Sequence, residues 1–215
     1  MENEPNKKIA NEHNLTEEQI KQMNEQLKIA HEKFKIEAEK FALLFDRQEL
    51  GPAFQYLLYF QTIAPNYSQE FHLYQCDKTA LKTFSDDAEF LHHLLPFANA
   101  NGTGSIYCFW DEGVGKKLDE MPVVVLGDEG GLHIVTENIL KLMQILTLDS
   151  EIGVDWDGAS YYTDCQGGSE HNQSYRAFIK AQFGLDPAED PGLLIQTAQE
   201  KYKTSFDQWC SKFYS

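Results

Sequence analysis

The residues of this chain that most resemble a reactive cluster are Asp128, Glu129 and His133, which stand close together in the sequence. Two neighbouring carboxylates can do acid–base chemistry when burial raises the pKa of one of them. Here the pair stands inside the glycine-flanked segment 127–131, where we expect a solvated hairpin loop that uses Asp as a turn former. A hydrolase is therefore the third and last of the hypotheses for this chain.

A second cluster, Asp155-Trp156-Asp157-Gly158, is similar to part of a calcium-binding loop. It is one carboxylate short of the EF-hand pattern and lacks the closing Glu. A turn is the better interpretation, and Trp156 either packs on the domain or stands exposed for a partner. The common nucleotide, zinc-protease and serine-hydrolase motifs are missing from the sequence. We therefore expect a non-enzymatic protein with no catalytic, cofactor-binding or metal-binding residues.

Acidic residues gather in the two predicted loops that flank an apolar run at Val123–Leu126. If this run is a strand with antiparallel neighbours, the loops lie at its opposite ends and form two acidic spots. The candidate protein-binding residues are these acidic groups and the tryptophan-containing cluster: Asp111, Glu112, Asp119, Glu120, Asp128, Glu129, Asp155, Trp156 and Asp157.

The chain has 215 residues and a net charge of −16, which repels nucleic-acid phosphates and attracts a basic protein partner. A simpler interpretation is that this charge only keeps the protein soluble. The four cysteines are widely spaced, the first residues are polar, and no apolar run approaches the roughly 20 residues that cross a bilayer. We expect a cytoplasmic protein with free thiols that binds neither nucleic acid nor membrane.

The N-terminal part, residues 1–65, is predicted to be a disordered lead-in over residues 1–13 followed by a helical arm. Asn14 or Thr16 can cap a helix that begins near Thr16, and its apolar residues recur every three or four positions between Ile20 and Phe45. This narrow stripe can dock on the domain, which we expect, or pair with another chain as a short coiled coil. Gly51-Pro52 starts a second helix that is apolar nearly all round.

Residues 66–215 contain alternating helix and strand signals. We predict strands at 70–76, 105–110, 123–126 and 132–135, with one more short strand within 150–170. Helices are predicted from Asp86 to a stop at Pro96, after an N-cap at Thr136, and over 173–183 and 191–213.

The order of these features resembles the SUKH superfamily, which includes fungal cell-wall-synthesis regulators and bacterial immunity proteins. The resemblance covers roughly residues 80–212 and rests on the order of the segments more than on any diagnostic motif. The matching segments are Gly104–Trp110, Pro122–Gly130, Asn138–Met143, Phe183–Leu185, Asp190-Pro191 and Ala198–Trp209.

The resemblance implies an α+β domain with a mainly antiparallel sheet packed against helices, to which this chain adds its N-terminal helical arm. It also implies a non-enzymatic immunity protein that binds a toxin domain, often a nuclease. We expect the outer surface of the sheet backed by helices to make this contact. Bacterial members vary in their contact residues, so none are transferred. The alternative hypothesis is an intracellular scaffold or regulator that docks through its N-terminal amphipathic helix. The toxin and the oligomeric state stay open.

Overall fold

The computed structural model describes residues 16–46, 50–162 and 168–213, and the lead-in predicted for residues 1–13 lies outside these ranges. The helices are α2 (Glu17–Leu44), α3 (Pro52–Ile63), α4 (Ala88–His93), α5 (Ile139–Ile145), α6 (Asn172–Phe183) and α7 (Pro191–Cys210). The strands are β1 (His72–Leu73), β2 (Leu94–Asn99), β3 (Ile106–Trp110), β4 (Val123–Leu126), β5 (Leu132–Thr136), β6 (Ile152–Val154) and β7 (Ala159–Tyr161). No helix in the described ranges combines the length and apolar character that crossing a bilayer requires.

The strands β1 to β5 form one sheet in chain order, and every neighbouring pair is antiparallel. The centre of the sheet is β3 beside β4, where Cys108 stands opposite Val124. The strands β6 and β7 make a separate hairpin. The predicted α+β class with a mainly antiparallel sheet is therefore confirmed.

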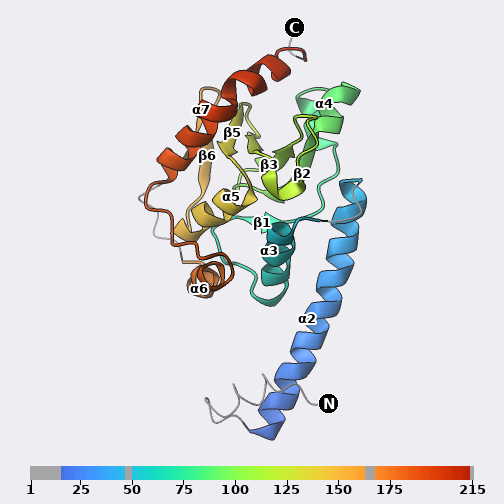
Figure 1. Ribbon diagram of the computed structural model, residues 1–215, viewed down its shortest axis with the longest axis vertical. Helices are drawn as coiled ribbons and strands as arrows, with labels where there is room; N and C mark the ends of the chain where they lie inside the picture. The colour runs from blue at the N-terminus through green and yellow to red at the C-terminus, as the bar shows by residue number, and fades with distance from the viewer. Residues whose placement is uncertain (1–15, 47–49, 163–167, 214–215) are drawn as a thin grey trace.

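Helices cover both faces of the five-stranded sheet. Because side chains alternate across a strand, β3 directs Tyr107 and Phe109 into one apolar cluster and Cys108 and Trp110 into another. The first cluster packs against α3 and α5, and the second packs against α4 and α7 (Figure 1). All residues of β3 and β4 are buried. The partner contact expected on the outer surface of this sheet-and-helix domain stays a prediction, and helices, not bare strands, form that surface.

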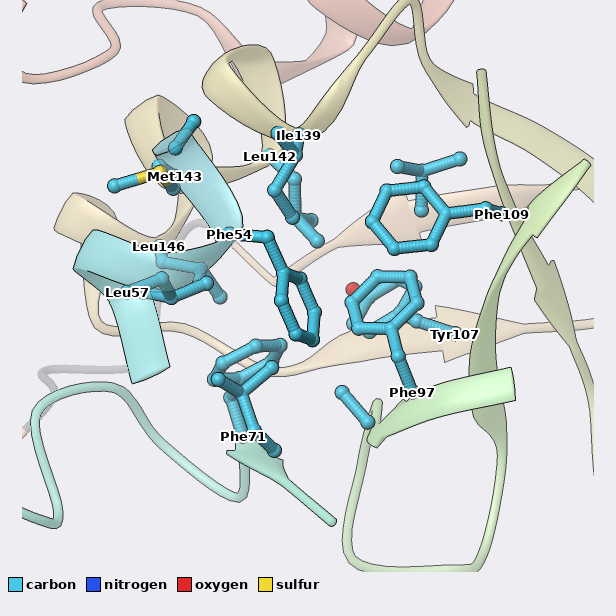
Figure 2. Close-up of a cluster of buried hydrophobic side chains, with 14 of the residues drawn as sticks. Phe54, Leu57, Phe71, Phe97, Tyr107, Phe109, Ile139, Leu142, Met143 and Leu146 are labelled. Atoms are coloured by element: carbon cyan, nitrogen blue, oxygen red, sulfur yellow. The ribbon is translucent and has the colours of Figure 1, made fainter. Parts of the chain in front are cut away.

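Phe54 of α3 is the centre of the first cluster. Its side chain is fully buried, and its ring centroid lies 5.1 Å from that of Phe41, 6.0 Å from Phe97 and 5.8 Å from Phe109. Figure 2 shows the ring between the aromatic side chains of the sheet and Leu142 of α5. The second N-terminal helix thus shares one core with the sheet.

The long helix α2 begins at a capping box, in which Thr16 and Gln19 exchange hydrogen bonds of 2.8 and 3.2 Å. Its inner end docks on the body through the buried Phe41 and Phe45. Farther out, Phe34 meets Tyr59 of α3 edge-on at 5.7 Å. The outer half of α2 then runs on past the end of α3 (Figure 1).

The helix predicted to reach Pro96 ends at His93 instead, and Leu94–Asn99 is the strand β2. The apolar run is buried on both sides in the sheet, and tertiary pairing with β3 overrides its local helical pattern. Pro96 is tolerated because β1 pairs only with Ala98 and Asn99, which leaves the Pro96 position without a β1 partner.

Three smaller predictions were also wrong. The strand expected over 70–76 is only His72–Leu73, which pairs with the last residues of β2. The N-cap of α5 is Asn138, whose side chain accepts from the Lys141 N–H at 3.0 Å, while Thr136 belongs to β5. The segment 150–170 holds the two strands of the β6–β7 hairpin and not one.

Removing the Phe54 ring tests whether α3 and the sheet share one core. Phe54→Ala is expected to lower the free energy of unfolding by about 3–5 kcal/mol, since it deletes a fully buried aromatic side chain. Ile63→Ala is the matched control in the same helix, because Ile63 is 43% exposed, and it should change stability much less. Equal effects in a urea titration would contradict the central place of Phe54.

Candidate functional site

A hollow of about 800 Å³ lies where the β4–β5 hairpin, the β6–β7 turn and α7 meet. A second hollow of about 360 Å³ shares His133, Asp157 and Lys203 with it and continues along α7 to Pro191. We call this continuous trough the α7 groove. The main residues that line its first part are Gly127–His133, Trp156, Asp157, Lys203, Asp207 and Cys210.

The two hairpins touch through glycines. Gly130 and Gly131 have φ angles of +116° and +87°, which L side chains rarely adopt. A Cβ atom at Gly130 would lie 2.4 Å from the Trp156 ring, and one at Gly131 would lie 2.2 Å from the Asp155 carbonyl oxygen. The β6–β7 turn therefore packs directly on the β4–β5 loop. Any residue larger than glycine at position 130 or 131 would push the turn and the loop apart.

Trp156 is 77% exposed although its ring rests against Gly130. Its turn is closed by the Asp155 N–H, which donates to the Gly158 carbonyl at 2.8 Å. The Asp155 carbonyl in turn accepts a hydrogen bond from Nε2 of His133 at 2.7 Å. Of the two possibilities for Trp156, packing on the domain or exposure, the structure shows exposure. The turn that carries it is held by the hydrogen bonds of Asp155.

Asp128 closes the base of the β4–β5 loop. Its Oδ1 accepts hydrogen bonds from the hydroxyls of Thr103 and Ser105, both at 2.8 Å. Slight burial opposes ionisation, but these two hydrogen bonds hold the pKa of Asp128 below its ordinary value. The carboxylate is therefore ionised at neutral pH and is engaged in holding two turns together.

The acid–base chemistry considered for Asp128, Glu129 and His133 requires a proton donor or a free base at the site. The lowered pKa of Asp128 makes it a poor acid, and Nε2 of His133 is bonded to a backbone carbonyl. Burial raises the pKa of the Cys210 thiol to about 12, so its nucleophilic thiolate form is scarce. Within the described ranges no three His, Cys, Asp or Glu side chains come together in a way that could hold a metal ion.

The α7 groove is acidic. Asp128, Glu129, Asp157 and Asp207 line its first part together with a single lysine, Lys203. The Nζ atom of Lys203 lies 2.6 Å from Oδ2 of Asp207, so this lysine forms an ion pair with one of the four carboxylates of the lining. The groove therefore contains an exposed indole ring and more acidic than basic side chains.

Five of the nine predicted binding residues meet at this groove: Asp128, Glu129, Asp155, Trp156 and Asp157. The sequence analysis placed Asp128 and Glu129 in one loop and residues 155–157 in another, unrelated loop. Nothing in the spacing of these residues shows that the two hairpins are in contact. It also missed Lys203 and Asp207, which are brought in by α7 from the far end of the chain.

The other four predicted residues lie in the loop between β3 and β4, at the opposite end of β4, as expected for antiparallel strands. Asp111 shapes the loop through its side chain, which accepts from the Gly113 N–H at 2.9 Å. Glu112 pairs with Lys116, whose Nζ lies 4.6 Å from the ring centroid of Tyr202 on α7. Asp111 and Glu112 thus stabilise the conformation of this loop, and Glu112 also holds Lys116, through which the loop contacts α7.

Asp119 caps α3 from across the fold. Its carboxylate accepts from the N–H groups of Ala53 at 2.8 Å and Phe54 at 3.2 Å, in a helix whose own N-cap residue is Gly51. Burial raises the pKa of Asp119 above its ordinary value, while these two N–H donors oppose the shift. A Cβ atom at Gly51 would lie 2.1 Å from this carboxylate, so glycine makes room for the cap. Asp119 is thus a capping residue, and only its neighbour Glu120 is exposed.

Comparison with known proteins adds no relative: no family model, no curated protein and no solved structure matches this chain.

Loss of the long-range cap should weaken the fold without touching the groove. Asp119→Ala is expected to lower the free energy of unfolding by about 0.5–2 kcal/mol, because two N–H groups of the first turn of α3 lose their acceptor. Glu120→Ala is the matched control, since it removes an exposed carboxylate from the same turn. Chemical unfolding of both variants checks this, and an undisturbed Asp119→Ala protein would contradict the capping role.

Proposed function

We propose that this chain is a non-enzymatic binding protein that holds a basic protein partner in the α7 groove. The observation that carries the proposal is Trp156, whose indole is 77% exposed, rests against Gly130 and shares its groove with the carboxylates of Asp128, Glu129, Asp157 and Asp207. Tryptophan is enriched among the residues that dominate binding energy at protein interfaces. Because its turn is already fixed, little conformational freedom remains to be lost on binding.

The chemistry of the groove favours lysine or arginine side chains on the partner. A cation over the face of an indole ring is attracted by the ring quadrupole, and the neighbouring carboxylates add a direct charge attraction. The net charge of −16 extends this attraction over the whole molecule and accelerates the encounter with a basic protein. The same field disfavours nucleic acid as the ligand.

We propose further that the partner is a toxin domain, such as a basic nuclease, and that binding neutralises it in the cytoplasm. The support for this step is the resemblance of residues 80–212 to SUKH immunity proteins, together with the acidic character of the groove. The three described cysteines, Cys76, Cys108 and Cys210, are free thiols, as suits a reducing compartment.

A second candidate function is a scaffold or regulator that docks through α2. The observation in its favour is that the outer half of this helix extends beyond the body (Figure 1). Deleting residues 1–48 is not a usable test, because it removes the buried Phe41 and Phe45. A truncation that stops before Phe34 leaves the core contacts of α2 in place.

The experiment for the toxin hypothesis is binding to the variable C-terminal domain of a large secreted protein, where one is encoded beside this chain. We expect Trp156→Ala to weaken this complex by at least 2 kcal/mol, or roughly 30-fold in Kd, as at an interface hot spot. Tyr162→Ala is the matched control, because Tyr162 is also an exposed aromatic residue near the end of the same hairpin but does not line the groove. Calorimetry of both variants measures the difference.

The association rate should also fall as salt rises, since screening shortens the reach of the acidic field. A complex that forms equally fast at low and high salt would remove the electrostatic part of the proposal. A complex that tolerates Trp156→Ala but is lost when the outer half of α2 is truncated would favour the regulator instead.

A further inference from the structure

The two strands of the β6–β7 hairpin are joined through alternate residues only. In an antiparallel pair, every second residue bonds to the facing strand, and the residues between them direct their N–H and C=O groups away from it. At the turn, the Asp155 N–H donates to the Gly158 carbonyl at 2.8 Å. At the open end, the Tyr162 N–H donates to the Glu151 carbonyl at 3.2 Å. The residue of β7 that bonds to β6 between these two ends is therefore Ser160, which stands opposite position 153.

Ala159 and Tyr161 are the residues of β7 that face outward. Their N–H and C=O groups point away from β6, and in the part of the chain that the structure describes no hydrogen bond reaches these four groups. The outer side of β6 is different, because Nδ2 of Asn101 donates to the Ile152 carbonyl at 3.2 Å. We call the outer side of β7 the free edge, since its donors and acceptors can pair with one more strand.

The free edge borders the second part of the α7 groove. Four consecutive residues, 158–161, line this hollow of about 360 Å³ together with one side of α7. Because side chains alternate between the two faces of a strand, four residues in a row indicate that the hollow runs along the backbone edge. Ala159 is half-buried and Ser160 is exposed, so the edge is accessible from the groove. A segment lying along β7 would reach the part of the groove that contains Trp156.

The charge of the groove selects a basic occupant for this edge. In the described lining, five carboxylates stand against one lysine, which is itself paired with a carboxylate. A second copy of this chain carries the same net charge of −16 and is repelled. A strand with Lys or Arg at every second position directs these side chains to one face, where carboxylates can meet them. The five carboxylates belong to Asp128, Glu129, Asp157, Asp190 and Asp207.

We propose that the partner binds by strand addition: an extended segment with Lys or Arg at alternate positions pairs with the free edge of β7 and brings one basic side chain to Trp156. The main-chain hydrogen bonds to Ala159 and Tyr161 provide affinity, and the carboxylates of the groove provide the preference for basic side chains. Strand addition rests on the proposed function, because it specifies how the basic partner occupies the α7 groove.

Amide hydrogen exchange measured by NMR on the full chain tests strand addition. The probe is an end-blocked heptapeptide of alternating lysine and threonine. At saturating peptide, the Ala159 amide should exchange about tenfold more slowly, because it gains a hydrogen bond. The Ser160 amide is the internal control, since it already bonds to β6 and should not change. The same peptide with glutamine in place of lysine should bind more weakly.

A proline variant tests the contribution of the edge itself. Ala159→Pro removes an N–H that points away from β6, and an edge strand tolerates proline at such a position, so the thermal transition should be retained. The affinity for the peptide should fall about tenfold, because a backbone hydrogen bond is lost and its acceptor is left unpaired. Ala159→Ser is the matched control, which keeps the N–H and should bind like the wild type. The exchange measurement on the wild-type chain does not depend on how the proline variant folds.

The outcomes separate strand addition from the proposed function. A peptide that leaves the Ala159 amide unprotected overturns strand addition, even where a basic partner domain still binds through Trp156. The same holds for an Ala159→Pro variant that binds the peptide like the wild type. An Ala159 amide protected without peptide would assign the edge to this chain's own residues or, where protection grows with protein concentration, to a second copy, and would also overturn it. If Ala159 is protected by the peptide but Trp156→Ala changes nothing, strand addition stands and the role proposed for Trp156 fails.

Discussion

The burial of the sheet on both faces is the constraint on which the rest of this structure depends. β3 and β4 contribute apolar side chains to two separate clusters, and a helix layer closes each of them. Phe54 of α3 completes one layer, and Phe206 of α7, edge-on to Trp110 at 4.8 Å, completes the other. With no free sheet face, any recognition surface must be built from loops, helix sides and the projecting arm.

The α7 groove follows directly from this arrangement. Once α7 lies across the sheet, its exposed side forms one wall, and the two hairpins beside it form the other. The glycines at positions 130 and 131 let the hairpins approach so closely that Trp156 is supported from beneath while most of its ring stays exposed. The packing of the two hairpins thus fixes the position of an exposed tryptophan beside α7.

Local patterns in the sequence predicted the elements well where one periodicity dominates. The stripe of α2, the start of α3 at Pro52 and the strands β3 to β5 are confirmed, and of the two N-caps considered for α2 the structure has Thr16. The errors arise where distant contacts decide: Leu94 and Leu95 belong to a strand because β3 pairs with them. Asp119 illustrates the same limit, since no local signal relates it to the first turn of α3, 66 residues away in the sequence.

The candidate site was predictable only in pieces. Its loop residues could be named from their composition, but the meeting of the β4–β5 loop with the Trp156 turn depends on tertiary packing. The most direct test of the central claim is the hydrogen–deuterium exchange footprint of the complex with the basic protein partner that we propose. The account predicts that the complex protects backbone amides in segments 127–133 and 155–158 and in the part of α7 around Lys203 from exchange. Protection confined to segment 111–120 or to α2, with the groove unchanged, would contradict it.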